Sequence, residues 1–181
     1  MAPNGASSNA LIIKDVTSTF NHLVGIWIAG PDITLKDCTT SFNGDSGISV
    51  FDMLGLGGGR SRVVLDGKIS SHHNIYEGMN LINSEVNVKG EVSLYLNERH
   101  GLRIPTYPGD ESFITVEAQG SFASCQNSEI DILHHGDDYS GVGGTISFVD
   151  EGTDGYTCDT SAEEHGAQGG LPICVPCPFC S

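Results

Sequence analysis

One arrangement of polar and apolar positions recurs along the chain: Asn, three variable residues, Gly, and then an apolar–any–apolar triplet. Its four clear copies start at Asn21, Asn43, Asn74 and Asn97. A fifth, degraded copy starts at Cys125 and has Glu129 in the Gly place. Repeats of about 20–30 residues are typical of solenoid proteins, in which each repeat packs on the next. The pattern therefore predicts a solenoid.

The residue types suit stacked β-coils. Equivalent positions of neighbouring coils lie about 4.8 Å apart, so identical side chains form columns. An Asn column can bond to itself, each amide donating to the next carbonyl, and form a ladder. We expect the Gly to allow positive φ in a turn, and the triplet to be a short strand with two inward side chains.

More columns lie upstream of each Asn. Positions five, three and one residue before it follow a period of two, so we expect them to face inward. The position directly before Asn holds Phe20, Phe42, His73 and Leu96. A further strand has inward apolar pairs, which are Leu11/Ile13, Ile33/Leu35, Val63/Leu65, Val86/Val88, Ile114/Val116 and Ile146/Phe148. Each coil thus has three short strands and three turns.

These columns divide the chain into three parts. Residues 1–10 are an N-terminal arm, disordered or truncated, residues 11–152 form five to six coils, and residues 153–181 are an irregular tail rich in Cys, Pro and Gly. The connections at 52–62, 105–112 and 134–144 are long. Solenoids place such insertions on one side, often the binding side.

The Asn ladder and the Gly-Ile-x-Ile strand starts resemble those of the pectin-lyase-like superfamily. The resemblance covers about residues 11–149 and implies a right-handed parallel β-helix. It implies no particular chemistry, because that superfamily includes lyases, glycoside hydrolases, epimerases, tailspikes and adhesins. Its polygalacturonan hydrolases carry a Gly-His-Gly and an Arg-x-Lys element. Here the first reads Arg99-His100-Gly101 and the second is missing.

Charge and cysteine content narrow the function classes. The chain has 8 basic and 23 acidic residues and a net charge of −15, which argues against nucleic acid as a partner. No apolar run is long enough to span a membrane. Six Cys suggest an oxidising compartment although no signal peptide is visible. We expect an extracellular or cell-surface fragment of a longer protein.

Two groups of residues are candidates for catalysis. Arg99, His100 and Arg103 could supply a base and neutralise a uronate carboxylate. Asp137 and Asp138 could act as general acid and base if held at a suitable separation. Adjacent carboxylates in a Gly-rich loop are more often solvated or weakly bind calcium, so calcium is the one possible cofactor.

Glycan binding is predicted at four outward positions. Trp27 is the only Trp and could stack on a sugar face. Lys36, Lys89 and Arg103 could hold an anionic polysaccharide on an otherwise acidic surface. Lysines on exposed strands also simply discourage aggregation, which remains the plainer explanation for them.

The remaining Cys and His residues suggest structure rather than metal binding. The spacing of the four cysteines in the tail favours disulfides over a zinc or iron–sulfur site. These disulfide candidates are Cys158, Cys174, Cys177 and Cys180. Cys38 and Cys125 are predicted to be buried thiols. His72 and His73, like His134 and His135, are neighbours whose side chains should point to opposite faces of a strand, so neither pair makes a metal site by itself.

These observations favour a non-catalytic surface module that binds a glycan or protein or has a structural role. The alternative is a carbohydrate-active enzyme, or the remnant of one, acting on acidic polysaccharide. A third possibility is ice binding, because Thr17, Thr19, Thr39 and Ser41 begin a regular hydroxyl array.

Overall fold

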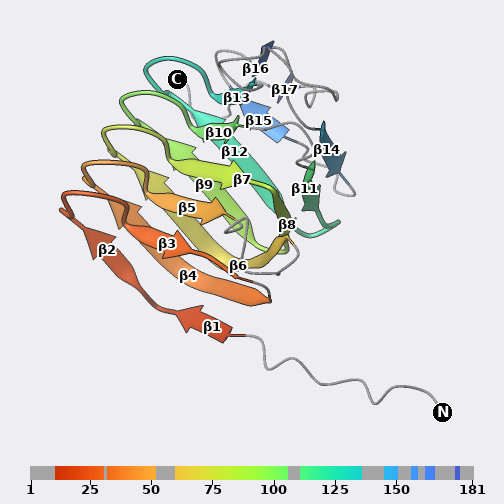
Figure 1. Ribbon diagram of the computed structural model, residues 1–181, viewed down its shortest axis with the longest axis horizontal. Coiled ribbons are helices and arrows are strands. Elements are labelled where there is room, and N and C mark those ends of the chain that lie inside the picture. Colours follow the sequence, from red (N-terminus) through yellow and green to blue (C-terminus); the bar gives the residue numbers. More distant parts are fainter. Residues whose placement is uncertain are drawn as a thin grey trace.

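The computed structural model describes residues 11–30, 32–51, 60–105, 111–135, 145–150, 156–158, 162–165 and 174–175. These residues form β-strands and turns without any helix, and every strand pair among them is parallel. The all-β class is therefore confirmed, and the parallel sheets are consistent with a β-helix solenoid. Figure 1 shows the strands stacked from β1 and β2 at the bottom to β16 and β17 at the top.

The strands belong to two sheets. The large sheet has eleven strands, which are β1 (Leu11–Lys14), β2 (Thr17–Thr19), β4 (Ile33–Ser41), β6 (Ser61–His72), β8 (Ser84–Val88), β9 (Glu91–Tyr95), β11 (Glu111–Val116), β12 (Ser121–Cys125), β14 (Thr145–Asp150), β15 (Tyr156–Cys158) and β17 (Cys174–Val175). The small sheet has six strands, which are β3 (Ile26–Ile28), β5 (Ile48–Phe51), β7 (Met79–Ile82), β10 (Leu102–Pro105), β13 (Ile132–His135) and β16 (Ala162–His165).

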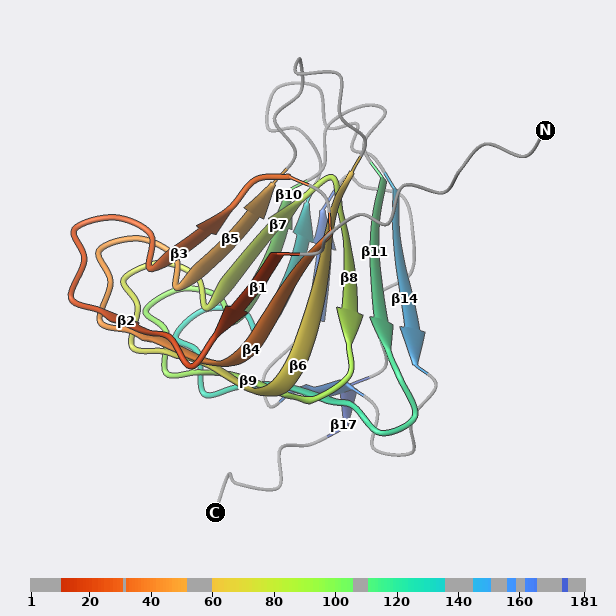
Figure 2. The same cartoon turned by 90° about the horizontal axis from the view of Figure 1, so that it is seen from below.

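The large sheet makes two of the three walls of the coil. Strands β4 and β6 are long and bent: one half of β6 pairs with β8 and the other half with β9. The bend lies at Asp37 and Gly67, whose φ angles of 51° and 64° are left-handed. Figure 2 looks along the stack and shows β8, β11 and β14 on one wall, β9 on a second and the small sheet on the third.

The core fills the space between these walls. In the middle coils, from β3 to β12, alternate residues of the strands point into it and are buried. From the small sheet these include Ile28, Val50, Leu81 and Ile104, and from the large sheet Leu35, Leu65, Val88, Val116, Ile69, Val92 and Phe122. Each coil adds one layer of apolar side chains, so a modest hydrophobic content suffices for a continuous core.

The asparagines of the repeat bond to one another along the stack. The Nδ2 of Asn21 donates to Oδ1 of Asn43 over 2.9 Å, and Asn43 donates to Asn74 over 2.9 Å. Asn74 donates to Asn97 over 3.0 Å, and Asn97 to Asn127 over 2.9 Å. We call these five residues the asparagine column.

The predicted fifth copy of the repeat was placed two residues too early. Asn127, not Cys125, continues the asparagine column. Ile132 pairs with Leu102, so Asp131 stands in the Gly place instead of Glu129. A shift of two residues preserves the alternation of inward and outward positions, so the apolar pattern alone did not reveal the error.

The position directly before each asparagine was predicted to face inward, and this was wrong. The residues there all have left-handed φ angles between 53° and 57°, and they are Phe20, Phe42, His73, Leu96 and Gln126. Phe20, Phe42 and Leu96 are exposed. The left-handed residue ends the strand and turns its side chain outward, which interrupts the period of two.

The glycines of the repeat are required for a different reason than predicted. Among the described glycines only Gly30 and Gly67 have left-handed φ angles. A Cβ atom added at Gly78 would lie 2.7 Å from Nδ2 of Asn97 and 2.8 Å from the carbonyl oxygen of Gly101. The glycine therefore makes room for the amide of the next coil.

The C-terminal part and the cysteines differ from the simplest expectation. Strands β15, β16 and β17 lie within the range predicted to be a tail, and β15 pairs with β12 while β16 pairs with β13.

Cys38 is a free, buried cysteine as predicted. Cys125 is disulfide-bonded, so its prediction as a thiol was wrong. The side chains of the four tail cysteines lie outside the described part.

Candidate functional site

The outer face of the small sheet carries one aligned row of side chains. Trp27 pairs with Ser49, Ser49 with Asn80, and Asn80 with Arg103. Arg103 pairs in turn with Leu133. Each step is about 4.8 Å, so Trp27 and Arg103 lie about 14 Å apart along one straight row.

The row begins with an aromatic platform. Trp27 is 62% exposed, and its ring stacks on Phe51 with ring centroids 5.2 Å apart. The exposed ring of Trp27, stacked on the half-buried Phe51, offers a flat apolar surface whose orientation is fixed by the contact between the rings. The contact with Phe51 therefore fixes the ring of Trp27 in an orientation in which it can stack on a flat ligand.

A second row runs beside the first, through the turns that precede the repeat glycines. It contains Ser46, Glu77 and His100, whose backbones are joined through the following glycines. Glu77 is buried, and its Oε2 accepts a hydrogen bond of 2.8 Å from Oγ of Ser46. Its Oε1 lies 4.0 Å from Nη1 of Arg103, so the two rows meet at Glu77 and Arg103.

His100 occupies the next coil of the second row. It is buried, and its Nε2 lies 3.4 Å from Oε2 of Glu129. The other oxygen of Glu129 lies 3.5 Å from Nε of Arg99, and Arg99 also lies over the ring of Tyr76. The three candidates Arg99, His100 and Arg103 are therefore brought together, each beside a glutamate.

Burial sets the protonation of His100. It lowers the pKa of the imidazole below the ordinary histidine value, because a charged ring would lose hydration. Glu129 and Glu77 oppose this shift, and Arg99 and Arg103 add to it. At neutral pH the ring is uncharged and can either donate or accept a hydrogen bond.

Three buried polar atoms of this cluster lack a hydrogen-bond partner among the described residues. They are Oε1 of Glu77, Oδ1 of Asn80 and Nδ1 of His100. Buried polar groups are nearly always satisfied, so such atoms point to a ligand or ordered water.

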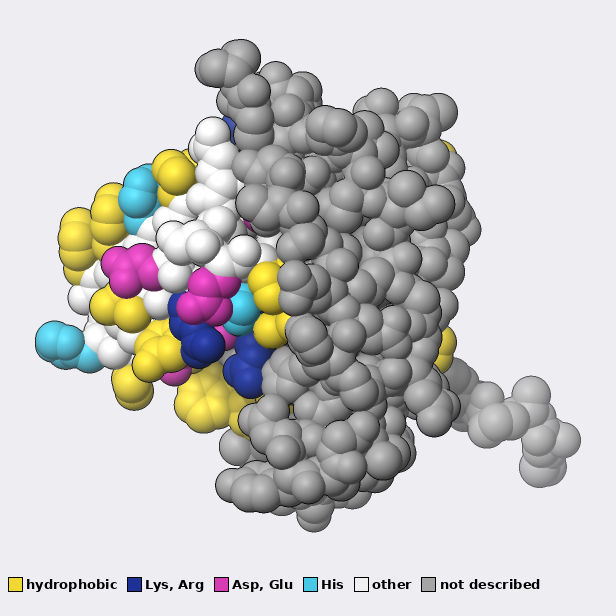
Figure 3. Space-filling view, turned by 90° about the horizontal axis from the view of Figure 1, so that it is seen from above, with side chains coloured by type: hydrophobic (Ala, Val, Ile, Leu, Met, Phe, Trp, Pro, Cys, Tyr) yellow, Lys and Arg dark blue, Asp and Glu magenta, His cyan; other side chains and the backbone are white. Residues whose placement is uncertain are grey.

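Figure 3 shows basic, acidic and histidine side chains gathered on one side of the molecule, next to hydrophobic ones. We call Trp27, Glu77, Asn80, His100 and Arg103 the small-sheet site.

The two lysines predicted to bind a glycan lie elsewhere. Lys36 is in the large sheet and donates to Oδ2 of Asp66 over 2.6 Å. That bond raises the pKa of Lys36 and lowers the pKa of Asp66. Lys89 follows β8 and lies 3.5 Å from Oε1 of Glu117. Both lysines are thus neutralised by carboxylates on neighbouring coils and are not part of the small-sheet site.

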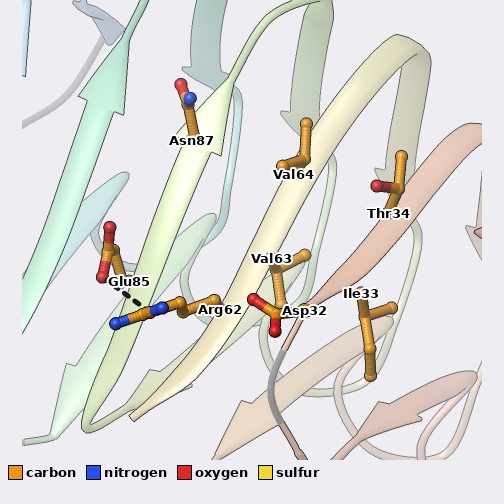
Figure 4. Close-up of a pocket in the computed structure, with 8 residues that line it drawn as sticks. All are labelled: Asp32, Ile33, Thr34, Arg62, Val63, Val64, Glu85 and Asn87. Carbon is orange, nitrogen blue, oxygen red and sulfur yellow. Dashed lines mark ion pairs between the residues drawn. The ribbon is translucent and has the colours of Figure 1, made fainter. Parts of the chain in front are cut away.

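The large sheet has a shallow hollow on its outer face (Figure 4). It is lined by residues of β4, β6 and β8 and of the turn before β4, namely Asp32, Ile33, Thr34, Arg62, Val63, Val64, Glu85 and Asn87. Its one ion pair joins Nε of Arg62 to Oε2 of Glu85 over 3.3 Å, and both side chains are exposed. The described residues that line the hollow include no arrangement of acid and base that suggests catalysis.

Sequence reasoning identified Trp27, Arg103 and His100 but missed Glu77 and Asn80. Asn80 could have been found from the sequence, because it is the middle residue of a repeat triplet, the position that Trp27 and Arg103 occupy in other coils. Glu77 could be found only by comparing the residues before the glycines across coils. Asp137 and Asp138 lie outside the described residues, so their catalytic or calcium-binding role stays a prediction.

Comparison with known proteins adds no assignment: no family model, no curated protein and no solved structure matches this chain. In the described part, no helix is long and apolar enough to cross a membrane.

Proposed function

We propose that the chain is a non-catalytic surface module that binds a carbohydrate chain on the outer face of the small sheet. The observation that carries this proposal is the aligned row from the exposed Trp27 to Arg103, with the half-exposed Asn80 between them. A sugar ring would stack on Trp27, because aromatic faces suit the apolar faces of sugars. Hydroxyl groups further along the glycan would contact the half-exposed side chains of Asn80 and Arg103.

The charges of the site favour a neutral glycan over an acidic one. Arg103 faces Glu77, and Arg99 and His100 face Glu129, so little positive charge is left over. Among the described residues, Oε1 of Glu77 and Oδ1 of Asn80 have no hydrogen-bond partner, and both atoms are acceptors, which favour donors over further anionic oxygens nearby. A uronate carboxylate near Glu77 would meet like charge instead. Binding should therefore depend only weakly on salt.

For the fold we propose a right-handed parallel β-helix of five to six coils, similar to that of the pectin-lyase-like superfamily, stabilised by the asparagine column as a ladder. The parallel pairing of successive coils and the amide bonds from Asn21 to Asn127 support this proposal. An extracellular or cell-surface location fits a glycan-binding role and belongs to the same proposal.

The proposal is tested by calorimetric titration of neutral and acidic oligosaccharides into the wild-type protein and its variants. Trp27→Ala and Asn80→Ala should each weaken binding about tenfold or more, as expected for central contacts. Neither change removes a core side chain. Lys89→Ala and Ser93→Ala alter the outer surface of the large sheet and serve as controls that should bind as the wild type does.

Loss of affinity in the Lys89→Ala variant, with full affinity in Trp27→Ala, would place the glycan on the large sheet and contradict the proposal. A strong preference for acidic oligosaccharides that disappears with added salt would contradict the neutral-glycan assignment.

A second candidate function is glycan cleavage, favoured by the uncharged, buried His100 beside Glu77 and Arg103. A neutral imidazole can act as general base. Incubation with pectate, alginate and neutral glycans, followed by measurement of reducing ends and of the ultraviolet absorbance of unsaturated products, tests it. Product formation that His100→Gln abolishes would support an enzyme, and no product from any glycan would leave the binding module.

A further inference from the structure

The neighbouring residues His72 and His73 lie on the same side of the chain. In a regular strand their side chains would point to opposite faces. His72 is the last residue of β6, and His73 has a left-handed φ of 53°. That conformation turns the second side chain outward beside the first. The expectation that the two side chains point to opposite faces was therefore wrong.

The two imidazole rings approach each other through the same atom. The Nδ1 of His72 lies 2.8 Å from the Nδ1 of His73, and the planes of the rings are nearly perpendicular, at 82°. At this distance one Nδ1 carries a hydrogen and the other offers its lone pair. The pair thus holds two nitrogen ligands on one outward-facing surface.

The rings next to the pair hold it in place. His72 stacks on Tyr95 of the following coil, with centroids 4.8 Å apart and planes 19° apart. His73 stacks on Phe42 of the preceding coil, with centroids 5.0 Å apart and planes 22° apart. Each imidazole is therefore packed against an aromatic ring of an adjacent coil, which limits the entropy that a ligand would have to remove.

The spacing of the two nitrogens selects a coordination geometry. With metal–nitrogen bonds of about 2.0–2.1 Å, nitrogens 2.8 Å apart subtend an angle of about 84–89° at the metal. This is close to the right angle between neighbouring positions of a tetragonal or square-planar ion. A tetrahedral ion would need a wider separation. The pair therefore suits Cu²⁺ or Ni²⁺ better than Zn²⁺.

We propose that His72 and His73 form a bidentate site for a tetragonal divalent ion, Cu²⁺ or Ni²⁺, bound through both Nδ1 atoms with water at the remaining positions. Among the described residues no group of three or more His, Cys, Asp or Glu side chains is suited to a metal, and the proposed site has two protein ligands. The site lies on the large sheet and is independent of the small-sheet site.

The proton balance of the site is simple when both rings are uncharged. The ring that carries hydrogen on Nδ1 changes to the tautomer with hydrogen on Nε2, which frees the second lone pair without net proton release. Both rings in the bound state then carry their hydrogen on Nε2.

Electron paramagnetic resonance of the untagged, full-length chain with one equivalent of Cu²⁺ tests the proposal. The wild type should show two equatorial imidazole nitrogens. His72→Gln and His73→Gln should each show at most one from this pair and bind Cu²⁺ about 100-fold more weakly, because the chain holds the second nitrogen at high effective concentration. His22→Gln removes an exposed histidine of the first coil and is the matched control.

Equal loss in the two single variants, with the His22→Gln control unchanged, would establish the site. Thermal melts should show that all three variants are folded, since none of them removes a core side chain. Retention of wild-type affinity and of the two-nitrogen signal in either single variant would overturn the proposal, as would tighter binding of Zn²⁺ than of Ni²⁺ in a parallel titration.

Discussion

Asn43 donates through Nδ2 to Oδ1 of Asn74 over 2.9 Å, and the same Oδ1 accepts the backbone N–H of Asn43 over 3.2 Å. Both side chains are fully buried. One amide oxygen thus satisfies two donors of the preceding coil, and the arrangement recurs between Asn74 and Asn97 and between Asn97 and Asn127. The asparagine column therefore fixes the register of each coil on the next.

Removing a buried member of this column should destabilise the protein. Asn74→Ala leaves two donors of Asn43 without their acceptor, which costs about 1–3 kcal/mol. Asn21→Ala is the matched control, because Asn21 is exposed and accepts no bond from a coil before it among the described residues. Thermal or denaturant unfolding should show a clearly larger loss for Asn74→Ala. Equal losses would contradict a stabilising role for the column.

Asn83 lies outside the asparagine column but is unsuitable as a control. Its φ of 45° is left-handed, so Asn83→Ala would replace a residue that tolerates this conformation with one that tolerates it less well. A loss of stability there would say nothing about the column.

The left-handed position before each asparagine should reverse the usual preferences of a strand. Leu96 has a φ of 54° and is exposed. Leu96→Val should destabilise by about 1 kcal/mol, because a β-branched side chain is strained there. Leu96→Asn should be tolerated or stabilising, because Asn enters this region readily. Unfolding free energies measured in denaturant would decide.

The opposite order, with Val tolerated and Asn harmful, is what an ordinary strand would give. It would show that Leu96 belongs to a regular strand and that the left-handed conformation with an outward side chain is not the one it adopts.

His100 should make stability depend on pH. Its lowered pKa means that the unfolded chain binds this proton more readily than the folded protein. Between the folded pKa and the ordinary value of about 6.5, the unfolded state binds more protons, so the free energy of unfolding falls as the pH falls. Denaturant melts from about pH 7.5 to about pH 5.5 should therefore show a smaller loss for His100→Gln than for wild type. An unchanged slope in His100→Gln would contradict the effect.

Most of the fold could be predicted from the sequence, because the repeat places at fixed positions the residue types that the stacking of one coil on the next requires. Asn at one place and a small residue four places later are required by neighbouring coils, so the first four copies could be aligned without a structure. The fifth copy failed because Asp131 replaces the glycine, and Ile130 and Ile132 both fit an apolar triplet. The pattern had two solutions there, and only the pairing of Ile132 with Leu102 separates them.

The site was less accessible to sequence reasoning. Trp27 and Arg103 were recognisable as outward residues of the same triplet position. Lys36 and Asp66 were also recognisable as members of one outward column and are direct partners in β4 and β6, but the column alone did not show that the lysine is bonded to the carboxylate and so lost to a glycan. Period-two reasoning also failed at His73, since one left-handed residue reverses the direction of a side chain.

The most direct test of the central claim uses Trp27 itself. It is the only tryptophan of the chain, it is 62% exposed, and its fluorescence therefore reports on the small-sheet site alone. Titration with neutral oligosaccharides should shift its emission to shorter wavelength and saturate at the affinity found by calorimetry, and Asn80→Ala should weaken that response about tenfold or more. A glycan that binds by calorimetry but leaves the emission of Trp27 unchanged would contradict the claim.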